Sequence, residues 1–245
     1  MTKIKTQNYL DKGKGKCILL IHGLFGALSN WEKVIKILSK NYRVIVPKLP
    51  ITKVSPSNAT IDGLTEFIAK FIKKKRLKNI SIIGNSLGGH LALTYAIKNQ
   101  NNIKKLILTG SSGLFENSFG GSFPKRGDYN YINERVDYTF YNPKILSKKY
   151  IKNIYNVLNN NEKCLNIIKL AKSAQRNNMS NLLKKITIPT LLIWGLNDTI
   201  TPPSVAHEFS RLIKNSEIKF IDQCCHAPMM EHPDLFNKYV INFLK

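Results

Sequence analysis

A serine flanked by glycines gives the sequence its clearest chemical signal. The segment Gly84-Asn-Ser86-Leu-Gly88 follows an apolar run and precedes a helical stretch. In this G-x-S-x-G context a sharp turn from strand to helix exposes the serine hydroxyl, and the glycines let neighbouring backbone pass closely. The N-terminus of the following helix favours negative charge. The segment predicts that Ser86 is a nucleophile; the alternative is a glycine-rich turn with an incidental serine.

A serine hydroxyl is a weak nucleophile and needs a neighbouring base. Among the five histidines, His226 follows the last expected strand, and a loop at the end of that strand can carry it to Ser86. His90 lies four residues after Ser86 on the expected helix and is predicted to be structural. His22 is expected to brace a glycine-rich loop through its ring nitrogens. His226 is therefore the candidate base.

The base in turn requires an acceptor that fixes its tautomer and stabilises the imidazolium. Asp198 follows an apolar run that ends near Trp194, which places it beyond the end of a strand. Asp222 is a rival because it lies only four residues before His226, but it ends a strand and is expected to cap the turn there. The candidate catalytic residues are thus Ser86, Asp198 and His226, in that chain order.

Attack on a carbonyl creates an oxyanion that needs preset hydrogen-bond donors. One candidate donor is the N–H of Leu87, directly after the nucleophile. The other is expected from the loop after the first core strand, where Gly23 and Gly26 allow a tight turn. Leu24 is the predicted second donor, with Phe25 as the alternative.

Short apolar runs that alternate with amphipathic helical patterns indicate how these residues are positioned. This alternation is typical of an α/β fold with a mostly parallel central sheet flanked by helices, and the nearly continuous apolar character predicts strands covered on both faces. The expected strands are 17–21, 43–46, 80–83, 105–108, 190–194 and 218–221, with a weaker one near 4–10.

One long interval breaks the alternation. More than 70 residues separate the strand that ends near Thr109 from the one that begins near Ile188, and a structureless loop of that length is improbable in a compact domain. The interval predicts an inserted, mainly helical lid at 113–185 within a core formed by 1–112 and 186–245. The alternative is a set of extra packing helices without a pocket.

Together these motifs resemble the α/β-hydrolase-fold serine hydrolases over nearly the whole chain. The resemblance rests on His-Gly at 22–23, Gly-Asn-Ser-Leu-Gly-Gly at 84–89, Pro-Thr-Leu-Leu-Ile-Trp-Gly-Leu-Asn-Asp at 189–198, and His226 before Ala-Pro. It implies hydrolysis through a covalent acyl-enzyme, with no cofactor and no metal. Esterases, meta-cleavage C–C hydrolases and carrier-protein methyl esterases share much of the pattern, because one fold carries many chemistries.

The elbow also resembles that of the meta-cleavage hydrolases, which use a lid arginine to hold a substrate carboxylate. Arg176 is the counterpart suggested by this resemblance. Other expected substrate contacts are Phe25, Tyr138 and Tyr141. Phe115 and Phe119 are further candidates for the pocket wall.

Two segments depart from the family pattern. The loop after the strand at 43–46 is Pro47-Lys-Leu-Pro50, where the family usually has an acidic, glycine-containing loop, so one wall of the pocket is expected to differ. Cys225 stands before His226 where the family usually has glycine. Cys225 is not expected to be the nucleophile, since its neighbouring position would direct it away from the base.

The formal charge of +23 invites a nucleic-acid or membrane-surface interpretation. However, lysine, isoleucine and asparagine all have A/T-rich codons, and the basic residues are dispersed. No nucleic-acid motif, membrane span or signal peptide is expected. The four cysteines lack disulfide or zinc spacing and indicate reduced thiols in a cytoplasmic protein.

The sequence therefore predicts a serine hydrolase that cleaves an ester-like bond of a small or medium acyl substrate. The alternatives are C–C hydrolysis, hydrolysis of a carrier-protein-linked acyl ester, and ligand binding on a hydrolase scaffold without catalysis. A possible partner is an acidic acyl-carrier protein, steered by lysines expected on the lid. Those lysines are Lys144, Lys148, Lys149 and Lys152.

Overall fold

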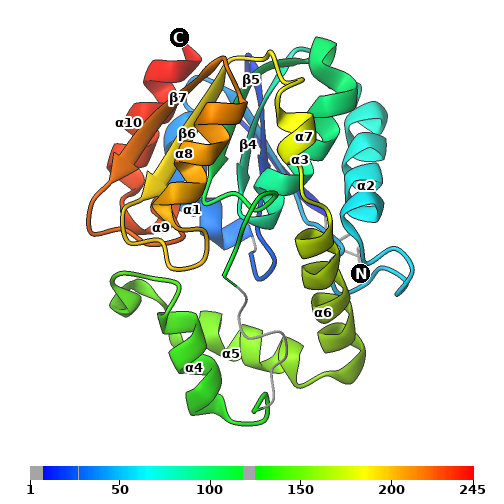
Figure 1. The fold of residues 1–245 in the computed structure, drawn as a ribbon, viewed down its shortest axis with the longest axis vertical. Coiled ribbons are helices and arrows are strands. Elements are labelled where there is room, and N and C mark those ends of the chain that lie inside the picture. Colours follow the sequence, from blue (N-terminus) through cyan, green and yellow to red (C-terminus); the bar gives the residue numbers. More distant parts are fainter. Residues whose placement is uncertain (1–7, 27, 118–124) are drawn as a thin grey trace, which may run out of the picture.

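The computed structural model describes residues 8–26, 28–117 and 125–245, and its centre is a seven-stranded sheet (Figure 1). The strand order is β1-β3-β2-β4-β5-β6-β7, and only β1 runs antiparallel to its neighbour. This confirms the predicted, mostly parallel α/β sheet. The strands are β1 Tyr9–Lys12, β2 Cys17–Ile21, β3 Arg43–Pro47, β4 Ile80–Asn85, β5 Ile103–Thr109, β6 Thr190–Gly195 and β7 Ser216–Ile221.

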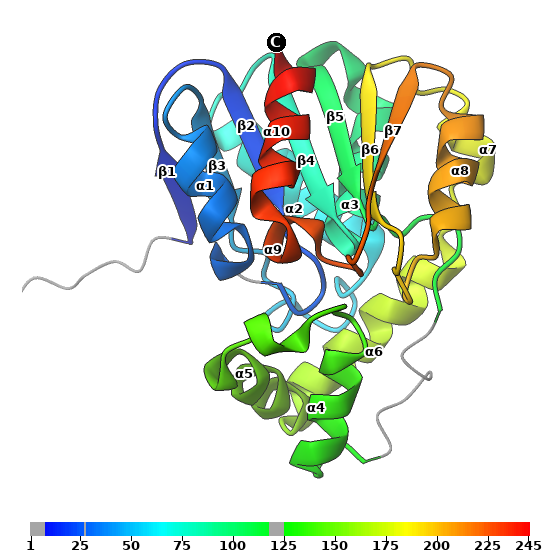
Figure 2. The same cartoon turned by 90° about the vertical axis from the view of Figure 1, so that its left-hand side faces the viewer.

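Helices cover both faces of the sheet (Figure 2). On one face α1 (Glu32–Leu38) packs against α10 (Pro233–Leu244), with the short α9 (Pro228–Glu231) beside them. On the other face α2 (Ile61–Lys74) packs against α3 (Leu87–Asn99). There α7 (Ser180–Leu183) joins α3 to α8 (Pro203–Leu212). This double cover explains why the central strands are almost entirely apolar and buried.

The interval between β5 and β6 is mainly helical. It contains α4 (Tyr129–Asp137), the 3₁₀ turn Pro143–Ile145, α5 (Lys148–Leu158) and α6 (Asn161–Arg176), which we call the helical insertion. Figure 2 shows these helices below the carboxyl ends of the parallel strands. The Oγ of Ser173 accepts a hydrogen bond from the backbone N–H of Ile61 at 3.0 Å, which ties α6 to α2.

The end of the predicted 113–185 lid differs in position from its middle. The short helix α7 lies against α3 and α8 on the flank of the sheet rather than below its edge. The division of the chain at 112 and 186 therefore stays a prediction about folding units. In the part of the chain that the structure describes, no helix is long and apolar enough to cross a membrane.

Gly88 tests how tightly the elbow is packed. A Cβ at this position would lie 2.1 Å from the carbonyl oxygen of Ile21 on β2, a contact that backbone cannot relieve easily. We expect Gly88→Ala to lower the free energy of unfolding by about 1–3 kcal/mol, as overpacking does. Urea unfolding measures the change.

The matched control is Gly127→Ala, because the nearest atom to a Cβ there is 4.0 Å away. We expect this variant to unfold within about 0.5 kcal/mol of the parent protein, as surface changes do. Equal losses in both variants would contradict the packing argument.

Candidate active site

Ser86 occupies a strained turn between β4 and α3. Its φ is 53° and its ψ is −122°, values that a non-glycine residue adopts only when its surroundings impose them. The backbone N–H of Ser86 donates to the carbonyl of Thr109 on β5 at 3.1 Å, and its own carbonyl accepts from the N–H of Ser112 at 3.2 Å. The turn is therefore fixed from both sides by the chain around β5.

His226 and Asp198 form a close pair at the ends of β7 and β6. The Nδ1 of His226 lies 2.9 Å from Oδ2 and 3.0 Å from Oδ1 of Asp198. The Asp198 carboxylate is buried, and it accepts further hydrogen bonds from the N–H of Ile200, the N–H of Thr201 and the hydroxyl of Thr201, each at 2.9 Å. A buried carboxylate requires such partners, because loss of hydration is costly.

The charges around His226 raise the pKa of its imidazole. Burial by itself lowers that pKa, but the charge of Asp198 and its hydrogen bond raise it, with smaller contributions from Glu116 and Glu231. The net direction is upward. The imidazolium is thus stabilised beside Asp198, which is the property that a base needs as it takes up a proton.

Asn85 joins the serine turn to the histidine loop. Its side-chain Nδ2 donates to the carbonyl of Thr109 and to the carbonyl of His226, each at 3.1 Å. The N–H of His226 donates to the carbonyl of Thr139 at 3.2 Å, so the histidine also contacts the helical insertion. At Gly110 a Cβ would lie only 3.0 Å from His226 Nδ1, which leaves no space for a side chain beside the pair.

The rival acid Asp222 has a different role. Its Oδ1 accepts from the N–H of Gln223 at 2.8 Å, so it caps the turn after β7, and the residue is exposed. Cys225 is buried, which raises the pKa of its thiol. Its sulfur lies 3.5 Å from the hydroxyl of Thr199. The geometry pairs His226 with Asp198 and gives the Cys225 thiol no exposed or activated position.

Ser86 and His226 line one small pocket with a volume of ≈ 80 Å³, which we call the Ser86 pocket. The loop after β2 contributes Leu24 and Phe25, the two residues considered as the second oxyanion donor, to the same pocket. Leu87 is buried at the first position of α3. The remaining walls are Gly23, Gly26, Asn30, Asn85, Thr139, Phe140, Tyr150 and Ala227.

His22 braces this loop as expected. Its Nε2 accepts a hydrogen bond from the N–H of Leu49 at 3.1 Å, and its Nδ1 lies 2.9 Å from the carbonyl of Gly23. An Nε2 that accepts leaves the proton on Nδ1, so the ring is neutral and joins the β2 and β3 loops. Burial lowers the pKa of His22, and the hydrogen bond to Gly23 only partly opposes this.

The structure does not bring the other predicted substrate contacts to Ser86. Arg176 is exposed at the end of α6 and lines a separate hollow with Thr60 and Ser173. Tyr138 and Tyr141 are 49% and 50% exposed, while Thr139 and Phe140 between them face the Ser86 pocket. Phe115 is also largely exposed, and Phe119 lies outside the described residues.

Tyr150 is the residue that the sequence analysis missed. It comes from α5, and burial raises the pKa of its phenol, which hydrogen-bonds to Asn30. With Ile154 and Leu158 it forms an i, i+4, i+8 stripe on α5, and this spacing is the signal that marks the inward face of the helix. Tyr150 therefore presents a neutral hydroxyl to the Ser86 pocket.

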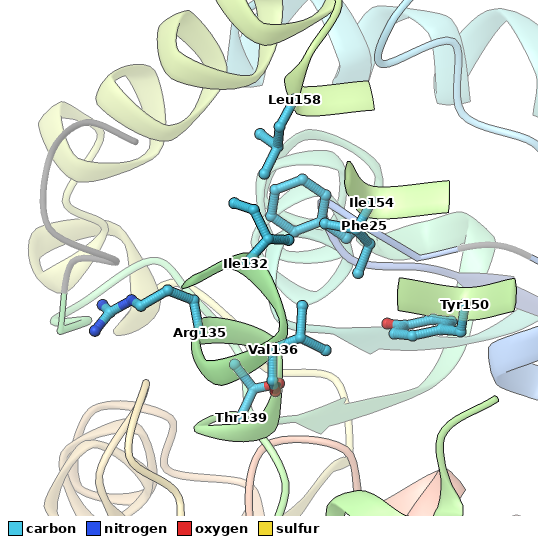
Figure 3. Close-up of a pocket in the computed structure, with 8 residues that line it drawn as sticks. All are labelled: Phe25, Ile132, Arg135, Val136, Thr139, Tyr150, Ile154 and Leu158. Carbon is cyan, nitrogen blue, oxygen red and sulfur yellow. The ribbon is translucent and has the colours of Figure 1, made fainter. Parts of the chain in front are cut away.

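Two further pockets adjoin the Ser86 pocket and share Phe25 and Tyr150 with it. The first, which we call the apolar pocket, has a volume of ≈ 40 Å³. In Figure 3 its apolar side chains gather around Phe25, and the guanidinium of Arg135 extends away from them. The second, larger pocket reaches Lys48 and is called the Lys48 pocket. Among the described residues no group of three His, Cys, Asp or Glu side chains is placed to hold a metal ion.

Comparison with known proteins agrees with this geometry. Residues 16–140 and 136–233 match the model of the α/β hydrolase fold family. The chain belongs to this family and is a hydrolase of the α/β fold.

Among curated proteins, the chain is 28% identical to the 2-hydroxy-6-oxo-6-(2'-aminophenyl)hexa-2,4-dienoic acid hydrolase of Metapseudomonas resinovorans, over 96% of this chain and 86% of that protein. It is 24% identical to a monoacylglycerol lipase of Homo sapiens, over 95% of this chain and 76% of the lipase. Among solved structures, an α/β hydrolase enzyme from a sediment metagenome of the Mar Chica lagoon, Morocco, is similar with a TM-score of 0.79 and 34% identity, covering 96% of this chain and 93% of that one.

The charge of Asp198 can be tested at His226 without any substrate. We expect NMR titration to place the His226 pKa above the ordinary histidine value of about 6.5, since Asp198 stabilises the imidazolium. Asp198→Asn removes that charge while burial remains, so the pKa is expected to fall. The assignment of the His226 signal is checked with His226→Gln.

Asp222→Asn is the matched control, because it removes one negative charge from an exposed turn four residues from His226. We expect it to leave the His226 titration nearly unchanged, owing to solvent screening. Equal shifts in the two variants would show that Asp198 has no special coupling to the imidazole.

Proposed function

We propose that the protein hydrolyses an ester-like bond of a small or medium acyl substrate through a covalent acyl-enzyme. The observation that carries the proposal is that Ser86, on a strained turn, shares a pocket with a histidine paired to a buried aspartate. A proton on Nδ1 of His226, held by Asp198, leaves the Nε2 lone pair as the base.

In the proposed reaction the Oγ of Ser86 attacks the carbonyl carbon while Nε2 of His226 takes the hydroxyl proton. The imidazolium then gives this proton to the leaving alcohol, and the acyl group stays on Ser86. A water molecule, deprotonated by His226, then attacks the acyl carbon. The ester bond to Ser86 Oγ breaks, the imidazolium returns its proton to this oxygen, and the acid is released. Asp198 stabilises the imidazolium in both halves of the cycle and remains ionised.

The N–H groups of Leu24 and Leu87 are the proposed donors to the oxyanion. Leu24 lines the pocket that holds Ser86, and Leu87 begins the helix that follows it. Both are backbone donors fixed by secondary structure, so they need no reorganisation when negative charge develops on the carbonyl oxygen. The His22 bridge between Gly23 and Leu49 supports the Leu24 loop.

The substrate is proposed to place an apolar part against Phe25. The apolar pocket is lined by Phe25, Ile132, Ile154 and Leu158, and its small volume suits a short acyl group. Phe25, Tyr150 and Ile154 line both this pocket and the Lys48 pocket. No cofactor is needed for this chemistry.

C–C hydrolysis is the second candidate function. It is favoured by the relatives that carry the name of dienoic acid hydrolases, at 24–28% identity. The exposed position of Arg176 away from Ser86 gives no support to the carboxylate contact inferred from that resemblance. Ester hydrolysis is therefore preferred. The buried or half-buried free thiols are consistent with a cytoplasmic location, which we also propose.

Labelling with a fluorophosphonate tests the nucleophile. We expect one covalent adduct, located on Ser86 by mass spectrometry, and none in Ser86→Ala. The control is Ser57→Ala, which changes an exposed serine near Ser55. We expect this variant to be labelled at Ser86 as completely as the parent protein. A folded parent protein without an adduct would favour ligand binding on a hydrolase scaffold.

The parent protein and Ser86→Ala also distinguish ester hydrolysis from C–C hydrolysis. We expect hydrolysis of a p-nitrophenyl ester series from acetate to octanoate, with Ser86→Ala slower by about 10³-fold or more. A 2-hydroxy-6-oxo-dienoic acid is supplied in parallel, and its loss is followed by absorbance. Exclusive turnover of the dienoic acid would overturn the ester proposal in favour of C–C hydrolysis.

An acidic acyl-carrier protein is proposed as a substrate carrier. The four lysines predicted on the lid are all exposed, and Lys148 and Lys149 occupy the first turn of α5. Cations in a first turn oppose the helix dipole, which is unfavourable by about 0.3–1 kcal/mol each, so their clustering there is not explained by helix stability. A surface of this kind attracts acidic partners.

Charge reversal of these lysines tests the carrier proposal. We expect replacement of all four by glutamate to lower kcat/KM for a carrier-linked ester about tenfold relative to a free ester at low salt, because steering is lost. The control reverses four other exposed lysines that lie outside the helical insertion, namely Lys33, Lys36, Lys40 and Lys98. An equal effect of both sets would leave only a general charge effect and contradict the carrier site.

A further inference from the structure

The Lys48 pocket is the largest of the three pockets that meet at Phe25. Its volume is ≈ 300 Å³, against ≈ 80 Å³ for the Ser86 pocket and ≈ 40 Å³ for the apolar pocket. It lies between the loop after β3 and the inward face of α5 and α6, where Leu49, Ile51, Asn153 and Ile167 contribute walls. A substrate carbonyl that is attacked by Ser86 occupies the Ser86 pocket. The volume of the Lys48 pocket is therefore available to another part of the substrate.

This pocket adjoins the site of the proposed reaction. It shares Leu24, Phe25, Gly26 and Tyr150 with the Ser86 pocket. Leu24 supplies the proposed oxyanion donor and lines both pockets, so the Lys48 pocket lies next to the place proposed for the substrate carbonyl. The apolar pocket opens on another side of Phe25.

The charge of the pocket comes from Lys48. The other lining residues with polar side chains are His22, Ser29, Thr52, Tyr150 and Asn153, and no described residue that lines it is acidic. His22 is neutral, because Nε2 accepts from Leu49 and burial lowers the pKa of the ring. The positive charge of Lys48 also contributes to this lowering of the His22 pKa.

The backbone of Lys48 is fixed while its ammonium has no ionic partner among the described residues. Its N–H donates to the carbonyl of Asn8 at 2.9 Å, and the next residue, Leu49, is held by His22. Lys48 lines a pocket that has no acidic residue among its described lining residues. A cation in such a place is suited to an anionic ligand.

We propose that the Lys48 pocket binds an anionic part of the substrate, a carboxylate or a phosphate, and that Lys48 sets this specificity. The inference rests on the proposed function, since it places the anionic group on the same substrate whose carbonyl is attacked by Ser86. The preferred substrate is then an ester with one short apolar half and one half that ends in a negative charge.

Paired substrates test the specificity. The first pair is the p-nitrophenyl ester of butyric acid and the p-nitrophenyl monoester of glutaric acid, which places the charge in the acyl half. The second set uses butyrate esters of propanol, 3-hydroxypropionic acid and 3-hydroxypropyl phosphate, which place a neutral group, a carboxylate or a phosphate in the alcohol half. The measured quantity is the ratio of kcat/KM for the anionic ester to that for its neutral partner.

We expect Lys48→Met to lower this ratio about tenfold for at least one anionic substrate. A charged hydrogen bond contributes more than this when buried, but the exposure of Lys48 weakens it. Lys48→Arg keeps the charge and is expected to retain most of the ratio. The matched control is Lys53→Met, an exposed lysine five residues away that does not line the pocket, and it is expected to leave the ratio unchanged.

A binding measurement separates this inference from the proposed function. Ser86→Ala, which cannot form an acyl-enzyme, is titrated by calorimetry with glutarate and with 3-hydroxypropyl phosphate, alone and combined with Lys48→Met. Anion binding that is lost with Lys48→Met supports the pocket even if the parent protein hydrolyses no ester. Equal ratios in the parent and Lys48→Met proteins, or anion binding that is insensitive to Lys48, overturn the inference while leaving ester hydrolysis intact.

Discussion

Burial of the Asp198 carboxylate is the constraint on which the site depends. A carboxylate that is only 4% exposed is tolerated because every lone pair direction meets a donor: two backbone N–H groups, the Thr201 hydroxyl and the His226 ring. These donors come from the ends of two neighbouring parallel strands. The pair therefore exists only when β6 and β7 end at the same level of the sheet.

Close backbone packing also connects the Asp198–His226 pair to the turn that holds Ser86. A Cβ on Gly195 would lie 2.2 Å from the carbonyl oxygens of Cys224 and Cys225, so β6 and the histidine loop touch without side chains between them. A Cβ on Gly110 would lie 3.0 Å from Nδ1 and from the carbonyl oxygen of His226. Asn85 then connects the histidine loop to the strand that precedes Ser86. The strain at Ser86 is thus balanced by contacts that surround it.

The helical insertion provides walls of the Ser86 pocket that the sheet does not provide. The carboxyl edge of the sheet presents the reactive groups, whereas α5 adds Tyr150 and the apolar wall that close the site. The insertion is tied to His226 by the bond from its N–H to the carbonyl of Thr139. The loop after α4 and the loop that carries His226 are therefore joined by a backbone hydrogen bond. The high positive charge lies mainly on exposed surface, and Lys48 and the lysines of α5 are among these exposed residues.

Local patterns in the sequence determined the sheet, its flanking helices and the order of Ser86, Asp198 and His226. Each follows from neighbours in the chain: an apolar run predicts a buried strand, and a polar residue just beyond it lies at the same edge as its counterparts. The choice of Asp198 over Asp222 was also accessible, since Asp222 caps a local turn.

Tertiary structure alone decided which side chains line the pockets. Tyr138 and Tyr141 were expected there, yet Thr139 and Phe140 face Ser86, because a small rotation of a chain segment exchanges its inward and outward residues. Arg176 lies at the end of α6 and lines a separate hollow, so the course of α6 keeps it away from Ser86. Tyr150 and Lys48 are about a hundred residues apart in sequence and line the same pocket only because the fold places α5 beside the loop after β3. Such contacts depend on the packing of whole helices, which no local pattern encodes.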